Sequence, residues 1–291
     1  MQPSMSTSYL WKLDPHAAIE CFADHGWRAL ELHYTHGSEL LEAGRPDQVG
    51  DRFRRFAADR GIHFPQGHFY AAQIGRDSGG PTWFDAAPAD DDAFALAVDE
   101  MRRWIDLFSA LGTKAAVLHV GGFALRDQGW SEKRILARRA QALTRMAEYA
   151  QGGPTTICLE NLPFPGSGVA TLAEIREILS AVNCSNVAIC LDTGHGNVAG
   201  VDCPQFIQGA ATHLAALHIN DNDAKSDGHV LPYGCGTIPW DRVLRALRAV
   251  HYQGPFNFEV PGEINCPEPV QMAKLDYALQ IAEWMVRCVA A

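Results

Sequence analysis

The sequence lacks several features that would assign it to large classes of proteins. It has no run of about 18 uninterrupted apolar residues, so no membrane-spanning helix is expected. Its first residues, MQPSMSTSYLWKLDP, contain neither the basic segment nor the apolar core of a secretory signal, which predicts a cytoplasmic location. No linker-like or low-complexity stretch interrupts the 291 residues, which predicts a single domain over residues 1–291.

Positive charge is also scarce. The chain has 24 Lys and Arg against 34 Asp and Glu, a formal net charge of −10. A protein that follows a phosphate backbone normally carries a basic excess, so bulk charge argues against a nucleic-acid partner and leaves only a local basic patch open. None of the eight cysteines forms a CxxC pair, and several lie inside apolar runs, which predicts buried free thiols rather than disulfides.

What the chain does contain is a regular alternation of short apolar runs and segments of helical periodicity. Eight runs, of which the first is the weakest, are predicted to be strands: 5–10, 27–33, 62–68, 115–120, 155–160, 187–192, 214–219 and 255–260. Helices are expected to start at Asp14-Pro15 and at Ser131, and to span 47–60, 91–111, 171–182, 203–212, 239–250 and 268–288. Apolar strands that alternate with helices are typical of a parallel sheet covered on its outer side. Eight such units predict an α/β fold, a (β/α)8 TIM barrel, with a doubly wound open sheet as the alternative.

Six successive strands finish on a side chain that can bind metal. These residues are His68, His119, Glu160, Asp192, His218 and Glu259. In a parallel barrel all strand ends of one kind meet around one mouth, so we expect these side chains to converge. A single strand-terminal His or acid is more often hydrogen-bonded to a loop, but six in succession with few Lys or Arg nearby would be costly to bury without a cation. The pattern predicts a metal site.

Two local strings add further candidates. CLDTGH places Asp192 and His195 three residues apart where a strand turns into a loop, so both can face the mouth. A later loop carries Asp227 and His229 as an Asp-x-His pair.

Together these strings resemble the xylose isomerase-like TIM barrel superfamily, which contains sugar isomerases and epimerases, dehydratases that act on inososes and dehydroshikimate, and endonuclease IV. The resemblance extends over nearly the whole chain. In the ketose epimerases of this superfamily one Mn, Co or Mg ion is held by ligands from the last four strands, and the matching residues here are Glu160, Asp192, His218 and Glu259. The arginine that those enzymes place shortly after the metal-binding histidine is absent, because Ala224 and Lys225 stand there.

The resemblance to endonuclease IV covers still more positions. Its trinuclear zinc site is matched in order and residue type by His68, His119, Glu160, Asp192, His195, His218, Asp227, His229 and Glu259. The sequence departs from a DNA-binding pattern in its acidity and in having no basic or aromatic wedge loop, with Arg126 as an isolated candidate.

The sugar-acting relatives imply removal of a proton next to a carbonyl of a small-molecule sugar or polyol-derived substrate, through an enediolate that a divalent metal (Mn, Co, Mg or Zn) stabilises. Glu160 and Glu259 would act as acid, base and metal ligands, and Asp192 and His218 as further metal ligands. His68, His119, His195, Asp227 and His229 would bind substrate or additional metal. We therefore predict a divalent-metal-dependent isomerase or epimerase of carbohydrate metabolism, with dehydration (a lyase reaction) as a variant.

Two other interpretations stay open. An endonuclease IV-like zinc phosphodiesterase acting on abasic DNA would use all nine residues but leaves the acidity of the chain unexplained. A non-catalytic binding barrel gives no reason for two matched carboxylates beside a metal. Neither a membrane nor nucleic acid is the expected partner, and a homo-oligomer stays open because many relatives form dimers or tetramers. Trp83, Phe123 and Trp130 are expected either to shield the substrate from water or to pack loops together.

Overall fold

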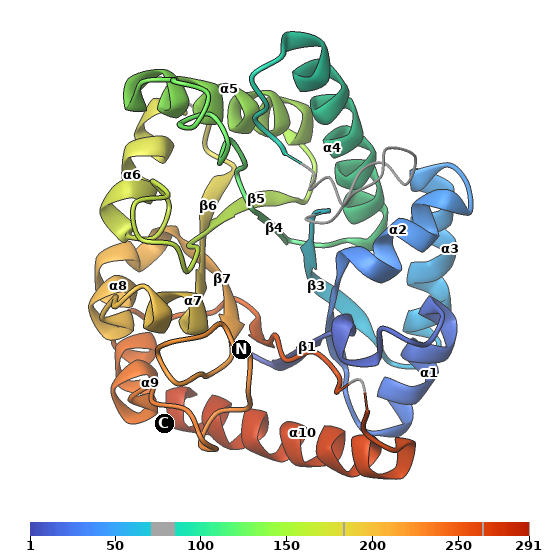
Figure 1. The fold of residues 1–291 in the computed structure, drawn as a ribbon. Helices are drawn as coiled ribbons and strands as arrows, with labels where there is room; N and C mark the ends of the chain where they lie inside the picture. Colours follow the sequence, from blue (N-terminus) through green and yellow to red (C-terminus); the bar gives the residue numbers. More distant parts are fainter. Residues whose placement is uncertain (71–84, 183, 264, 291) are drawn as a thin grey trace.

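The computed structural model describes residues 1–70, 85–182, 184–263 and 265–290. Eight parallel strands close into a barrel in chain order, with the last strand paired to the first (Figure 1). The strands are β1 (Pro3–Ser6), β2 (Ala29–Leu32), β3 (His63–His68), β4 (Ala115–Leu118), β5 (Thr156–Glu160), β6 (Val187–Asp192), β7 (Leu214–Ile219) and β8 (Phe256–Phe258). The predicted (β/α)8 TIM barrel is confirmed, and the open-sheet alternative is wrong.

The first strand lies earlier than the sequence predicts. The expected run 5–10 is a strand only to Ser6, and the 3-10 helix η1 (Thr7–Leu10) takes up the rest. The Ser6 hydroxyl accepts a hydrogen bond from the backbone N–H of Ser8, which caps this tight turn. Thr7 accepts from the backbone N–H of His33, so the turn is also tied to the end of β2.

Helices form a ring outside the strands (Figure 1). The helices are α1 (Pro15–Asp24), α2 (Tyr34–Glu42), α3 (Pro46–Ala58), α4 (Asp91–Leu111), α5 (Glu132–Ala150), α6 (Leu172–Ala181), α7 (Thr193–Val198), α8 (Cys203–Ala210), the 3-10 helix η2 (Ala211–His213), α9 (Trp240–Ala249) and α10 (Glu268–Ala290). Asp14 caps α1 as predicted, with Pro15 at the first helical position. The short helices α2 and α7 were not predicted, because each follows directly on a strand and begins at a polar strand end, His33 or Asp192.

The interior of the barrel is filled by small side chains. One buried cluster consists of Ala115, Val117, Cys158, Ala188, Cys190 and Ala216, from β4 to β7. Alternate residues of a strand face the same side, so the next inward position on each of these strands lies two residues further on. Those next positions are His119, Glu160, Asp192 and His218. This apolar cluster therefore lies directly beneath a layer of polar side chains at the carboxyl ends of the strands.

All eight cysteines are free, as predicted, with Cys158, Cys190 and Cys203 buried and Cys235 exposed. In the described part of the chain, none of the helices has the length and apolar character needed to cross a membrane.

Candidate active site and metal centre

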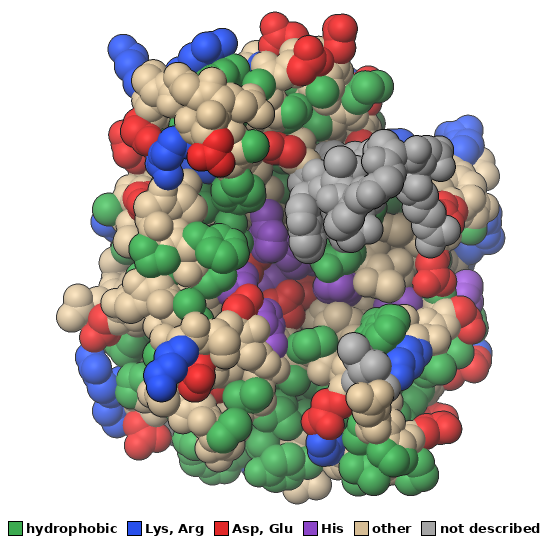
Figure 2. Space-filling model, in the orientation of Figure 1, with side chains coloured by type: hydrophobic (Ala, Val, Ile, Leu, Met, Phe, Trp, Pro, Cys, Tyr) green, Lys and Arg blue, Asp and Glu red, His purple; other side chains and the backbone are tan. Residues whose placement is uncertain are grey.

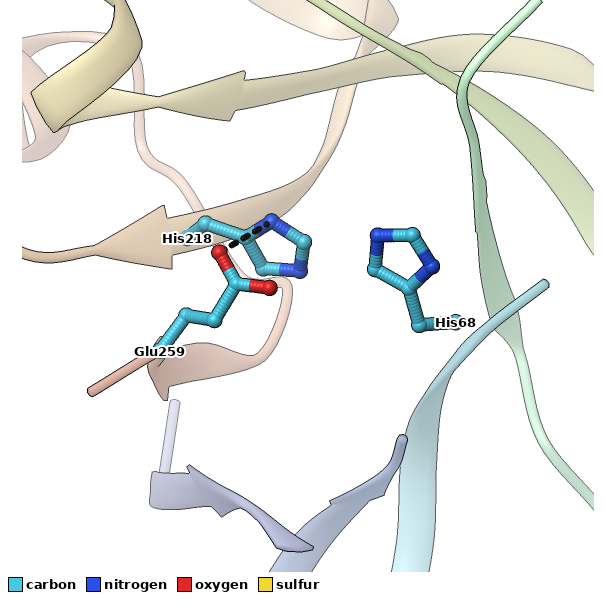
Figure 3. Close-up of side chains that lie close together, drawn as sticks. All are labelled: His68, His218 and Glu259. Carbon is cyan, nitrogen blue, oxygen red and sulfur yellow. Dashed lines mark ion pairs between the residues drawn. The ribbon is translucent and has the colours of Figure 1, made fainter. Parts of the chain in front are cut away.

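Four predicted ligands converge where the last four strands end. Glu160, Asp192, His218 and Glu259 each offer a ligand atom, and these atoms all lie within 4.8 Å of one another. His218 Nδ1 lies 2.9 Å from Glu160 Oε1 and 3.2 Å from Glu259 Oε2. Figure 3 shows His218 and Glu259 facing each other, with His68 reaching toward them from the opposite wall. The barrel thus collects side chains that are distant in the sequence into one cluster.

The chemistry of this cluster fits a divalent cation. Among the described residues, none of these three carboxylates forms an ion pair with Lys or Arg. Glu160 Oε2 and His119 Nε2 are both buried and lie 2.9 Å apart. A carboxylate oxygen and an imidazole nitrogen this close together suit two ligands of one divalent ion. Within the described residues, the three buried carboxylates of the cluster are balanced only by histidines, and a metal would compensate the rest of their charge.

Two further groups flank the four-residue cluster. His68, His119 and Glu160 form one of them, with ligand atoms again within 4.8 Å of one another. In the other, Asp227 lies between two histidines, with its Oδ2 3.3 Å from His195 Nε2 and its Oδ1 3.1 Å from His229 Nε2. The structure therefore brings all nine sequence-predicted site residues to one end of the barrel.

Three of the histidines share one hydrogen-bonding arrangement. The Nδ1 atoms of His68, His195 and His229 lie 2.7, 2.8 and 2.9 Å from the backbone oxygens of Phe69, Asn161 and Glu259, respectively. A carbonyl oxygen only accepts, so Nδ1 carries the proton in each ring and Nε2 is left to face the site. Metal-binding histidines are usually oriented in this way.

Asp192 is held by the residues around it. Its Oδ1 accepts from the backbone N–H of His195 at 2.7 Å, and its Oδ2 accepts from Asn220 Nδ2 at 2.9 Å. Asn161 binds the backbone of Asp192 through both its oxygen and its nitrogen. The carboxylate is thereby fixed in one orientation at the end of β6.

One residue of the site was missed by the sequence analysis. Glu31, buried on β2, lies with its Oε2 2.7 Å from His218 Nε2 and accepts from Gln66 Nε2 at 2.6 Å. Burial by itself raises the pKa of Glu31, but the adjacent His218 lowers it to about 2, so the carboxylate is charged. An acid in the middle of the apolar run WRALELH was the available signal.

The two candidate acid–base carboxylates differ in their surroundings. Burial raises the pKa of Glu259 to about 7, and this side chain lines the pocket. Burial also acts to raise the pKa of Glu160, but His218 and His119 lower it well below its usual value. Glu259 can therefore exchange a proton near neutral pH, whereas Glu160 stays ionised.

The site opens into a pocket of about 960 Å³. Figure 2 shows histidine and acidic side chains at the bottom of a hollow surrounded by hydrophobic ones. Trp11, Phe123 and Phe164 are exposed and line this pocket. Phe123 lines the pocket and also packs against Arg139, so both expectations for it stay open. Trp130 instead packs beneath Arg134, whose guanidinium carbon lies 3.5 Å from the ring centroid.

Two other residues were singled out in the sequence. Trp83 lies outside the described residues. Arg126 lines the pocket but is engaged by Glu132, with Nε 2.7 Å from Oε1.

The model of the xylose isomerase-like TIM barrel family matches residues 19–288. The chain belongs to this family. Within the family, the chain is 28% identical over 239 residues to the D-psicose 3-epimerase of Enterocloster bolteae, covering 78% of this chain and 67% of that protein. It is 27% identical over 188 residues to a probable endonuclease 4 of Symbiobacterium thermophilum, covering 59% of this chain and 66% of that protein.

The fold of this family member also matches solved structures over its whole length. The D-psicose 3-epimerase of Clostridium cellulolyticum H10, solved with D-tagatose, superposes with a TM-score of 0.80 at 20% identity, covering 98% of this chain and 99% of that one. Some curated relatives are matched over only about half of their own length, as for one uncharacterised protein with 52% coverage.

Proposed function

We propose that this protein is a divalent-metal-dependent isomerase or epimerase that removes a proton next to a carbonyl of a sugar or polyol-derived substrate. The observation that carries the proposal is the convergence of Glu160, Asp192, His218 and Glu259 within 4.8 Å, with Glu259 lining a pocket. Relatives named as D-psicose 3-epimerase, L-ribulose 3-epimerase and inosose isomerase support a sugar or a polyol-derived ketone as the substrate class.

The four residues would hold one Mn, Co, Mg or Zn ion, and a carboxylate-rich donor set with a single histidine suits these metals. A divalent cation there supplies Lewis acidity, which stabilises negative charge on the carbonyl and hydroxyl oxygens of the substrate. Glu259 would accept the proton, because its carboxylate lines the pocket beside the other three candidate ligands. Glu160, at the end of β5, would be the second carboxylate.

The outcome depends on where the proton is returned. Delivery to the opposite face of the same carbon gives epimerisation, and delivery to the neighbouring carbon gives aldose–ketose isomerisation. Loss of a β-hydroxyl instead gives dehydration. His68, His119, His195 and His229 line the pocket and would bind substrate oxygens or further metal.

Incorporation of solvent deuterium tests the proposal directly. Metal-loaded protein would be incubated in deuterium oxide with a panel of ketoses, inososes and keto-glycosides, and exchange followed by mass spectrometry. We expect exchange with at least one class, and loss of exchange by about 10²-fold or more in Glu259→Gln protein that retains its metal. Full metal occupancy with no exchange on any panel member would reject the proposal.

The two flanking groups of ligands favour a second candidate, a zinc phosphodiesterase acting on abasic DNA. The proximity of His195, Asp227 and His229, and of His68, His119 and Glu160, is what three adjacent ions would need. Metal analysis separates the candidates, because one ion per chain supports the sugar enzyme and close to three zinc ions support the nuclease. Cleavage of an abasic-site duplex that is lost in Glu160→Gln protein would establish the nuclease.

A further inference from the structure

Two adjacent arginines of α5, Arg138 and Arg139, are both buried but are neutralised differently. Arg138, 8% exposed, donates to Asp91 Oδ1 at 2.5 Å and to the backbone oxygen of Ala89 at 2.8 Å. Arg139, 4% exposed, has no carboxylate within 4.0 Å among the described residues. A buried guanidinium without a counter-charge is costly, so the environment of Arg139 is incomplete as it stands.

Backbone carbonyl groups accept hydrogen bonds from only some of the N–H donors of Arg139. Its Nε donates to the carbonyl oxygen of Gly121 at 2.9 Å, and its Nη1 donates to that of Ser167 at 2.8 Å. Nη2 has no acceptor in the part of the chain that the structure describes. Arg139 lines the same pocket as Glu259, which belongs to the group of four candidate ligands, Glu160, Asp192, His218 and Glu259, here called the metal-ligand cluster. A purely structural role, in which Arg139 links the loops after β4 and β5, accounts for the hydrogen bonds of Nε and Nη1 but not for the Nη2 donors.

Two glycines keep space around this guanidinium. Gly122 and Gly168 have φ values of +69° and +78°, and a Cβ at these positions would lie 3.4 Å from Arg139 Nε and 2.8 Å from Arg139 Nη1. The negative charge of Asp85 acts on Arg139 without a direct ion pair, and its Oδ1 accepts from the backbone N–H groups of Gly122 and Ala87. The guanidinium therefore borders the pocket without a directly paired carboxylate among the described residues.

The guanidinium shares its pocket with candidate metal ligands. Arg139, His119 and Glu259 all line this pocket, and the carbonyl that accepts from Arg139 Nε belongs to Gly121, two residues after His119. Phe123 forms the adjacent wall, with its ring centroid 5.4 Å from the Arg139 guanidinium carbon.

We propose that Arg139 binds an anionic group, a carboxylate or a phosphoryl group, at the end of the substrate remote from the reacting carbon. The site would then select a sugar acid or a sugar phosphate over the neutral sugar. Arginine suits this role because its fork of N–H donors matches the oxygens of either anion. The inference deepens the proposed function and rests on it for the reaction, but anion binding can be measured separately.

Calorimetric titration of metal-loaded protein with inorganic phosphate and with acetate tests the binding site, and repeating it on metal-free protein separates binding at Arg139 from binding at the metal. We expect wild type to bind at least one of the two anions in both forms, and Arg139→Gln to weaken that binding about tenfold or more. Arg138→Gln, which alters the neighbouring buried arginine outside the pocket, should retain this anion binding. Wild type that binds neither anion, or binding that survives Arg139→Gln, would overturn the proposal.

Substrate selectivity provides the second readout. Exchange would be compared for D-fructose and D-fructose 6-phosphate, D-ribulose and D-ribulose 5-phosphate, and 5-keto-D-gluconate as the carboxylate. We expect a lower KM for the anionic members, and Arg139→Gln to raise that KM about tenfold or more while kcat on a neutral sugar changes little. An equal loss on neutral and anionic substrates would show that Arg139 only links the two loops.

Arg139→Lys keeps the positive charge and covers the case in which the glutamine variant fails to fold. It should keep part of the anion binding, and its complete loss in folded protein would count against a charge-based site. If no sugar undergoes exchange at all, the proposed function fails, and the anion titrations still decide this inference.

Discussion

His218 on β7 and Glu31 on β2 form a fully buried pair, with His218 Nε2 2.7 Å from Glu31 Oε2. This contact directs the Nε2 proton toward β2 and leaves Nδ1 facing Glu160 and Glu259. A carboxylate behind a ligating histidine fixes the tautomer and raises the basicity of the ring. We therefore expect Glu31 to position His218 within the proposed metal-ligand cluster.

Replacement of Glu31 by Gln should weaken metal binding about 10- to 100-fold, because the ring of His218 loses the charge that makes it basic. Competition with a chromogenic chelator would measure the affinity. Glu20→Gln, which removes an exposed carboxylate paired with Arg60, is the matched control and should leave the affinity unchanged. Equal metal affinities for wild type and Glu31→Gln would show that the pair has no part in binding.

Gly194, in the TGHG string, has no room for a side chain. A Cβ there would overlap Asn220 Oδ1 and lie 2.9 Å from Asn222 Nδ2. Since Asn220 also holds Asp192, Gly194→Ala should lower the free energy of unfolding by about 1–3 kcal/mol and weaken metal binding as well. Urea denaturation and chelator competition would measure the two effects. Unchanged stability would mean that the Asn220 side chain can move aside freely.

The loop between β7 and α9, which carries Asp227 and His229, is organised by the buried Asp221. Its carboxylate accepts four hydrogen bonds of 2.7 to 3.1 Å, from the backbone N–H groups of Asn222, Thr237 and Ile238 and from Trp240 Nε1. An amide at this position would set its own NH2 group against one of these donors.

Asp221→Asn should therefore cost about 1–3 kcal/mol of stability, since a buried donor loses its acceptor. Thermal and urea unfolding would measure the loss. Asp223→Asn changes an exposed acid of the same loop, whose Oδ1 accepts from the backbone of Lys225 and Ser226, and should stay within about 0.5 kcal/mol. Similar losses for both variants would contradict the role assigned to Asp221.

His36 in α2 is expected to make stability depend on pH. Burial lowers the pKa of His36, while its contact with the Leu13 carbonyl and the charge of Asp14 oppose the shift. Below the usual histidine pKa of about 6.5, the unfolded chain then binds a proton at His36 more readily than the folded chain does. The contribution of His36 to the free energy of unfolding is therefore present above this pH and is lost as the pH falls below it.

His36→Gln removes this titration. The difference in unfolding free energy between wild type and His36→Gln should decrease as pH is lowered from about 7.5 to about 5. Urea unfolding at several pH values would measure it, and a difference that is constant or grows toward acid would refute the assignment.

The sequence pattern predicts most of the architecture because strands and helices depend on residues that are close together in the chain. Apolar strand runs and helix caps such as Asp14 are set by residues a few positions apart, and seven of the eight strands lie within the predicted runs. The first strand was misplaced because the hydrogen bonds of Ser6 and Thr7 end it early, and those contacts are not visible in an apolar pattern.

The sequence by itself determined the barrel and the residue types at its strand ends, since both follow from alternation along the chain. Only the tertiary structure added Glu31 and Arg139 to the nine site residues that the strand ends and loops predicted. Glu31 and His218 are 187 positions apart, and Arg139 reaches the pocket from a helix rather than a strand. Closure of the barrel creates these neighbours, because inward-facing positions from separate strands meet in space with no trace in local spacing.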